Sequence, residues 1–229
     1  CAFLSSTVPI IALSNNIGKY IYVQNEKMDL PSFRIHTQQL SFDLFKKALF
    51  PDPNFVKQDG NSFTDGTSLL KFNPVTNKLT YVNTSIPENT EEKLGDMITT
   101  SVQYINSHSG WTDSYYYSNV FQKPNKVVFQ LYLKNYPVSN DHSRIEIEIG
   151  DNKVHSYQRP FVEYVSYSIE NVEIESGEKI IEKLNAENIK FDDLGIFYSY
   201  GPEKEMQPSW FYKQNNSWRK FSEVNPRRD

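Results

Sequence analysis

The chain has 229 residues, a formal net charge of −4 and one cysteine, and 14% of its residues are aromatic. This length can bury a core in one large or two small domains, and the aromatic content is too high for a disordered chain. The acidic balance gives no support to nucleic-acid binding, which normally needs a basic face. One cysteine excludes an intrachain disulfide and a multi-cysteine zinc module.

Residues 1–36 lack clear periodicity except at 19–23 (KYIYV), where the pattern predicts a strand. The sequence LPS at 30–32 predicts a break in secondary structure. The apolar stretch at 8–13 contains Pro9 and is far shorter than the roughly 20 residues of a membrane span. The leading Cys1 fits either a processed lipoprotein terminus or the boundary of a fragment, and we favour the fragment boundary.

Three segments have the apolar spacing of helices. The first, 38–50, ends before Pro51, because proline lacks an amide hydrogen. The second, 88–109, has acidic residues in its first turn and Gly110 as its C-terminal cap. The third, 177–187, has Ser176 as its N-cap.

The remaining segments have strand patterns, and the clearest is 145–149, where Ile and Glu alternate as in an antiparallel strand with one buried face. Residues 62–72 and 78–82 predict a hairpin, and Asn215-Asn216 predicts a tight turn between the last two strands. The other predicted strands are 111–120, 126–133, 161–169, 196–200, 209–213 and 218–221.

Helices and antiparallel hairpins in mixed order predict an α+β fold rather than a nucleotide-binding βαβ sheet. A rough quasi-repeat, in which each half has a helix followed by paired strands, predicts two small domains with mainly antiparallel sheet and one or two packed helices. We place them at 37–120 and 121–229, after the leading segment 1–36.

No motif for catalysis, cofactor binding or metal binding stands out. The sequence has neither a phosphate-binding glycine loop nor a nucleophile elbow, and its four histidines are far apart. Glu146 and Glu148 fit the solvated face of a strand better than a pair of catalytic carboxylates. The sequence therefore predicts no catalytic, cofactor-binding or metal-binding residues and no cofactor.

The aromatic run Tyr115, Tyr116 and Tyr117 follows Trp111 closely, and neighbouring side chains of a strand point to opposite faces. At least one ring should therefore be exposed or lie in an interface. A two-sided sheet covered by the other half is the plainer interpretation. Because Tyr and Trp are favoured in protein contacts, these four residues are also our candidates for partner contact, and a carbohydrate-stacking platform is a further alternative.

Seven short motifs occur in an order that resembles the YycH (WalH) family. Each motif alone is weak, but together they span roughly residues 35–225. They are LFPDP at 49–53, TDG at 64–66, LTYVN at 79–83, GWTD at 110–113, VVFQLY at 127–132 with YPV at 136–138, YQRP at 157–160, and PSWFY at 208–212. The sequence departs from the family pattern at Ser139, where we expect an apolar or aromatic residue.

The resemblance implies a non-enzymatic accessory regulator of the WalK/WalR (YycG/YycF) two-component system, which controls cell-wall metabolism in Gram-positive bacteria. It implies that the full protein is anchored by one N-terminal membrane helix, with its bulk at the extracellular face of the cytoplasmic membrane. It also implies action with the related protein YycI on the sensor histidine kinase WalK. This chain resembles the two C-terminal domains, which we expect to be soluble, and 1–36 would be a remnant of the missing N-terminal region or a linker from it.

Two other hypotheses remain open. A ligand-binding sensor module for a cell-wall fragment would use the Tyr115–Tyr117 strand and Trp111. A wall-acting enzyme would need a cleft that holds carboxylates with perturbed pKa values or a metal site.

Overall fold

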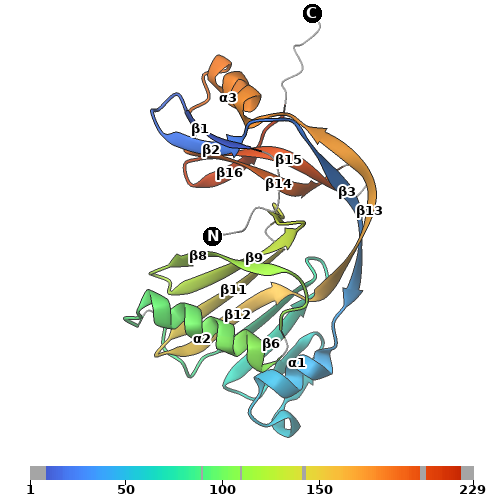
Figure 1. Cartoon of the computed structure of the whole chain (residues 1–229). Helices are drawn as coiled ribbons and strands as arrows, with labels where there is room; N and C mark the ends of the chain where they lie inside the picture. Colours follow the sequence, from blue (N-terminus) through green and yellow to red (C-terminus); the bar gives the residue numbers. More distant parts are fainter. Residues whose placement is uncertain (1–8, 89, 109, 141–142, 202–204, 223–229) are drawn as a thin grey trace, which may run out of the picture. The chain divides into compact units, whose positions relative to one another are not determined.

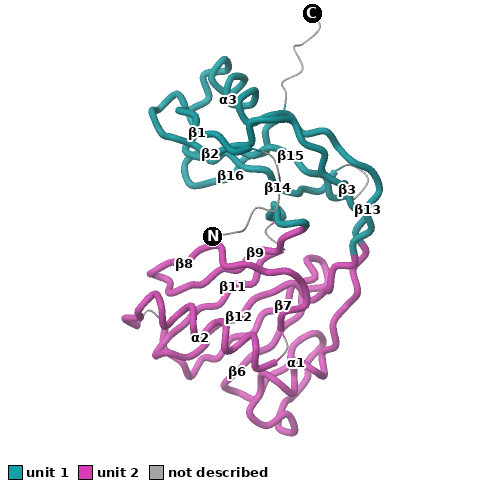
Figure 2. The backbone as a smooth tube through the Cα atoms, in the orientation of Figure 1, with its two compact units in different colours: residues 1–35, 134–139, 166–229 teal, residues 36–133, 140–165 magenta. Residues whose placement is uncertain are grey.

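Figure 1 shows the computed structural model, which describes residues 9–88, 90–108, 110–140, 143–201 and 205–222. The chain forms two compact units, and each is discontinuous in sequence (Figure 2). Unit 1 contains residues 1–35, 134–139 and 166–229, and unit 2 contains residues 36–133 and 140–165.

Unit 2 is built on one antiparallel sheet with the strand order β9-β11-β12-β7-β6-β5-β4, and β8 pairs with β9. The central strand β11 places Ile145 opposite Phe129 of β9 and Ile147 opposite Tyr157 of β12, and all four side chains are buried. The strands are β4 (Lys57–Asp59), β5 (Ser62–Thr64), β6 (Ser68–Asn73), β7 (Lys78–Asn83), β8 (Tyr115–Phe121), β9 (Lys126–Leu133), β11 (Arg144–Gly150) and β12 (Lys153–Pro160).

Two helices cover the apolar face of this sheet. Helix α1 (Phe42–Leu49) buries Phe45 and Leu49 and ends at Phe50, directly before Pro51. Helix α2 (Leu94–Ser107) buries Met97, Ser101 and Ile105, which lie four residues apart and so share one face. A short 3-10 helix, η1 (Pro53–Phe55), follows α1. The helices and the sheet enclose one core in which the rings of Phe42, Phe63, Phe72 and Phe161 pack together.

Unit 1 combines a hairpin, a second sheet and one helix. Strand β1 (Ile10–Ser14) pairs with β2 (Tyr20–Gln24), and the second sheet has the order β13-β3-β15-β14 with β16 on β15. Helix α3 (Gly177–Ala186) buries Ile180, Ile181 and Leu184 against residues of β2 and β14. The other strands are β3 (Met28–Gln39), β10 (Tyr136–Pro137), β13 (Val162–Ile174), β14 (Asp193–Tyr200), β15 (Glu205–Gln214) and β16 (Ser217–Lys220).

The α+β fold with mainly antiparallel sheets is confirmed, and so are several local predictions. Ser176 caps α3 by accepting a hydrogen bond from the Lys179 amide (3.5 Å). Asn215 and Asn216 both have positive φ in the β15–β16 turn, as a type I′ hairpin requires. Helix α2 is shorter than predicted, because it begins at Leu94 and not at residue 88.

The two units do not follow the predicted division at residue 120. That position lies inside β8, which pairs with β9 along its length. Residues 1–36 are also more than a leading segment, because β1, β2 and most of β3 belong to the body of unit 1. Strand β3 runs through the predicted break at Pro31, whose carbonyl oxygen accepts a hydrogen bond from the Tyr198 hydroxyl (2.9 Å).

None of the helices in the described ranges has the length and the apolar character that crossing a membrane requires.

Candidate functional site

The GWTD motif forms the link between α2 and β8 in unit 2. The Gly110 amide donates to the Ile105 carbonyl (2.9 Å) and so closes the end of α2. A side chain at Gly110 would not fit, because a Cβ atom there would lie 2.8 Å from both Ile105 Cγ2 and His108 Nε2. Glycine thus lets the chain turn tightly from the helix into the strand that carries the tyrosine run.

The four predicted contact residues divide into an inward pair and an outward pair. The Trp111 ring packs edge-on against Phe129 (5.1 Å between centroids), and the hydroxyl of Tyr115 is buried. In contrast, Tyr116 is 52% exposed and Tyr117 is 47% exposed. Only Tyr116 and Tyr117 therefore offer a large ring surface to a partner, while Trp111 and Tyr115 fix the segment to the core.

The guanidinium group of Arg159, on β12, is fully buried and holds the GWTD segment in place. It donates hydrogen bonds to the Gly110 carbonyl and to Thr112 Oγ1 (2.7 Å), and also to the Tyr157 hydroxyl (3.3 Å). Its Nε donates to the Pro160 carbonyl (2.9 Å), and its Cζ atom lies 5.3 Å from the centre of the Phe45 ring. Burying a charged group costs free energy unless its hydrogen-bond donors find acceptors, and these contacts supply them.

A carboxylate is linked to Arg159 through a threonine. The Thr112 hydroxyl donates to Asp113 Oδ2 (2.9 Å), and Asp113 Oδ1 accepts from the Tyr164 amide (3.1 Å). Burial raises the pKa of Asp113, and these hydrogen bonds and the charge of Arg159 oppose that rise. The chain Arg159–Thr112–Asp113 thus connects the GWTD segment to β12 and to the start of β13, which are about 50 residues away in sequence.

The other ionisable groups around Arg159 are neutral near pH 7. Burial, together with the charge of Arg159, lowers the pKa of His108 from 6.5 to about 4. Burial raises the pKa of the Tyr115 and Tyr157 hydroxyls. We call Arg159, Thr112, Asp113, Tyr157 and His108 the Arg159 cluster, and its contacts form a buried hydrogen-bond network.

A cavity of about 400 Å³ that is wide open to solvent lies elsewhere in unit 2, beside α2, the end of β7 and the start of β12. Its volume is within the range of small-molecule sites. Apolar and polar side chains both line it, and they include Tyr81, Ile86, Asn83, Gln103, Tyr104 and Lys153.

Glu146 and Glu148 both lie near the Lys126 ammonium group, at 3.2 and 3.4 Å. They are thus ion-paired on one strand face. Within the part of the chain that the structure describes, no group of three or more His, Cys, Asp or Glu side chains is placed to hold a metal ion.

Residues 18–226 match the family described as "YycH protein, C-terminal domain". This match covers most of the chain. The chain belongs to the YycH family.

Comparisons of sequence and of structure with YycH of Bacillus subtilis agree with this assignment. The chain is 24% identical over 236 residues to the "Two-component system WalR/WalK regulatory protein YycH" of Bacillus subtilis (strain 168), which covers 92% of this chain and 52% of that protein. The crystal structure of YycH from Bacillus subtilis matches with a TM-score of 0.77 and 22% identity, over 94% of this chain and 58% of that one. The chain therefore spans about half the length of the relatives it matches.

A third match concerns the fold only. The crystal structure of an uncharacterized protein from Eubacterium rectale has a TM-score of 0.50 and 11% identity, over 92% of this chain and 88% of that one.

Sequence reasoning missed two features of this YycH-family chain. Arg159 lies in the YQRP motif, and a charged residue in a strand that also carries Tyr157 could have suggested a buried network. Tyr20 and Tyr22 are about three-quarters exposed in unit 1, and their i, i+2 spacing in YIYVQ already places both on one strand face.

Proposed function

We propose that this chain is the C-terminal part of a non-enzymatic extracytoplasmic protein that regulates a WalK-type sensor histidine kinase together with a YycI-type partner. The observation that carries the proposal is the family match over residues 18–226, supported by the regulatory name of the Bacillus subtilis relative. The Arg159 cluster is compatible with it, since its buried cation and hydrogen bonds hold the GWTD segment in place.

The contact surface would be the outward part of β8. Tyr116 and Tyr117 are the exposed rings, and Trp111 and Tyr115 support them from the core side. Strand β8 has the sequence YYYSNVF and carries no charged residue, and an edge strand without charges is suited to pairing with another strand. Exposed tyrosines beside it would supply the apolar centre of an interface.

The test is light scattering after size-exclusion chromatography, with this chain alone and mixed with the extracytoplasmic part of a YycI-type protein. We expect a stable complex with the natural chain and at least a roughly tenfold weaker complex with a Tyr116→Ala/Tyr117→Ala variant. Phe55→Ala is the matched control, because Phe55 is a 74% exposed ring in the same unit, away from β8.

Two results would count against this proposal. If the two proteins elute separately, the contact does not lie in these residues. If the tyrosine variant and the Phe55 variant bind equally well, the complex forms but β8 is not its surface.

A second candidate function is a ligand-binding sensor module for a cell-wall fragment, and the cavity of about 400 Å³ in unit 2 favours it. A ligand that binds the folded chain raises its melting temperature by mass action. We expect a concentration-dependent rise with at least one member of a panel of wall fragments, and an unchanged melting temperature across the panel would contradict this function.

A further inference from the structure

The hairpin β1–β2 of unit 1 presents an aromatic face to solvent. Every second side chain of each strand points outward. The register pairs Ala12 with Tyr22 and Ser14 with Tyr20 on this face. Tyr20 is 74% exposed and Tyr22 is 75% exposed. The Cα positions of the two tyrosines are about 6.6 Å apart along the strand, on a face completed by Ile10 and Gln24.

The opposite face of the hairpin is fixed to the core. Ile21 and Val23 are buried against α3. The approach is close at Gly177, where a Cβ atom would lie 2.3 Å from Val23 Cβ. The backbone beneath the two tyrosines is therefore held firmly.

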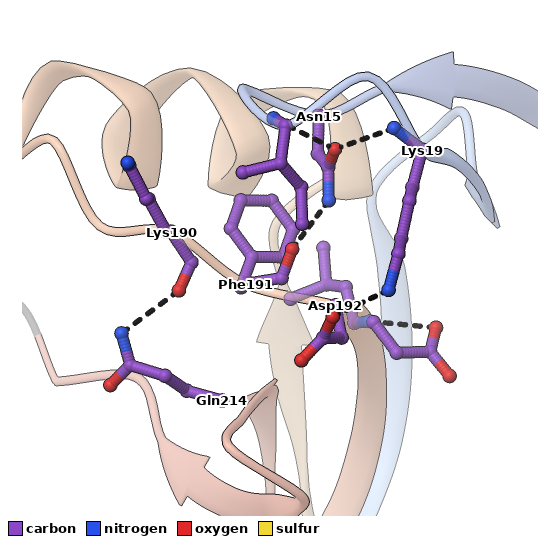
Figure 3. A network of polar contacts seen from close by, with 9 residues as sticks. Asn15, Lys19, Lys190, Phe191, Asp192 and Gln214 are labelled. Atoms are coloured by element: carbon purple, nitrogen blue, oxygen red, sulfur yellow. Dashed lines mark hydrogen bonds and ion pairs between the residues drawn. The ribbon is translucent and has the colours of Figure 1, made fainter.

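The loop of the hairpin is also fixed, as Figure 3 shows. The buried Asn15 side chain donates to the Phe191 carbonyl (2.5 Å) and accepts from the Lys19 amide (2.9 Å). The Lys19 ammonium group forms an ion pair with Asp192 (2.5 Å). A rigid support lowers the entropy cost when the exposed rings bind a ligand.

The ion pairs beside this face leave no excess of positive charge. The six outward side chains are uncharged. Lys19 is paired with Asp192, and Lys27 is paired with Glu173 (2.7 Å) and Glu175 (3.3 Å). This arrangement offers no unpaired positive field of the kind that draws a protein to an anionic ligand or an anionic membrane.

The area of the platform favours a small ligand. With about 200 Å² for each tyrosine side chain, the two rings expose together about 300 Å². A stable protein interface buries about 800 Å² on each partner. A few sugar rings match the smaller area.

We propose that Tyr20 and Tyr22 form a stacking platform for a neutral saccharide chain. The negative face of each phenol ring attracts the C–H groups on the apolar face of a sugar ring, and Ser14 and Gln24 lie beside the rings to hydrogen-bond the hydroxyl groups. This inference rests on the sensor candidate and deepens it by naming a ligand class, and it assigns the ligand to unit 1 instead of to the unit 2 cavity.

The experiment is a titration of the whole chain with cellotetraose and with its N-acetylated counterpart chitotetraose, followed by NMR of backbone amides. We expect saturable binding with a dissociation constant near the millimolar range, with shifts at residues of β1 and β2. A Tyr20→Ala/Tyr22→Ala variant should bind at least roughly tenfold more weakly. Tyr22→Phe, which keeps the ring, should bind like the natural chain.

The matched control is Phe55→Ala, because Phe55 is exposed to the same 74% as Tyr20 but lies in unit 2. The absence of saturable binding to either tetrasaccharide would overturn the proposal, as would equal binding by the double variant. Lipid vesicles that bind the natural chain but not the double variant, without saccharide binding, would also overturn it. Saccharide shifts around the unit 2 cavity would keep the sensor candidate but refute this site.

Discussion

His108 should make the stability of the chain depend on pH in a defined window. Its ring lies against Tyr104, Tyr157 and Phe45, and its Nε2 atom is 3.2 Å from the Tyr157 hydroxyl. Burial and the nearby Arg159 charge lower its pKa from 6.5 to about 4. Between these two values the unfolded chain binds a proton that the folded chain does not. The free energy of unfolding therefore falls as the pH falls from about 6.5 to about 4.

The size of this effect follows from the pKa difference. At about 1.36 kcal/mol for each pKa unit, the shift corresponds to at most about 3.4 kcal/mol. Because His108 is only partly buried, solvent screening should reduce this loss to about 2 kcal/mol. Above pH 7 His108 is neutral in both the folded and the unfolded chain, so this loss of stability should vanish.

The assay is urea unfolding of the natural chain and of His108→Gln at several pH values from 7.5 to about 4.5. Other groups titrate in the same range. Burial raises the pKa of Asp113, whereas at Asp65 the effect of burial is outweighed by hydrogen bonds from Ser68 and Thr67, which lower the pKa. These groups are present in both proteins, so the difference between the two curves isolates His108. We expect the natural chain to lose stability relative to the variant as the pH falls, and parallel curves would refute the reasoning.

Three further substitutions test the packing, each by denaturant unfolding. Arg159→Met should lower the free energy of unfolding by about 3–5 kcal/mol, because it leaves buried acceptors without their donor; a loss below about 1 kcal/mol would show that the network is dispensable. Gly177→Ala should cost about 1–3 kcal/mol through the contact with Val23, and an unchanged midpoint would contradict this close approach. Asn15→Ala should lower the free energy of unfolding by about 1–3 kcal/mol, because it leaves the Phe191 carbonyl unpaired. An unchanged free energy of unfolding would contradict this.

Local signals in the sequence were sufficient where one segment decides its own structure. Ser176 before an apolar stripe predicted α3, and Asn215-Asn216 predicted a hairpin, because capping and positive φ depend on few residues. The start of α2 was misplaced, because Glu92 precedes the helix and accepts hydrogen bonds from the Thr90 hydroxyl and the Asn152 amide instead.

Long-range pairing decided what sequence patterns could not. Strand β12 was not predicted, because its sequence KVHSYQRP lacks simple alternation and two of the hydrogen bonds of its buried Arg159 go to the distant GWTD segment. The division into units likewise depends on β3 pairing with β15, from the opposite end of the chain. The tyrosine run gave no indication of which rings face inward, since the β8–β9 register and its bulge set that.

The Arg159 cluster accounts for two of the motifs by which the family is recognised. GWTD and YQRP meet in one hydrogen-bond network, and the residues of that network are buried or turned inward. A buried network can fix a fold, but it offers little surface to a partner. The recognition surface of this chain should therefore be sought among exposed side chains on rigid supports, and Tyr116–Tyr117 and Tyr20–Tyr22 are two such pairs, one on each unit.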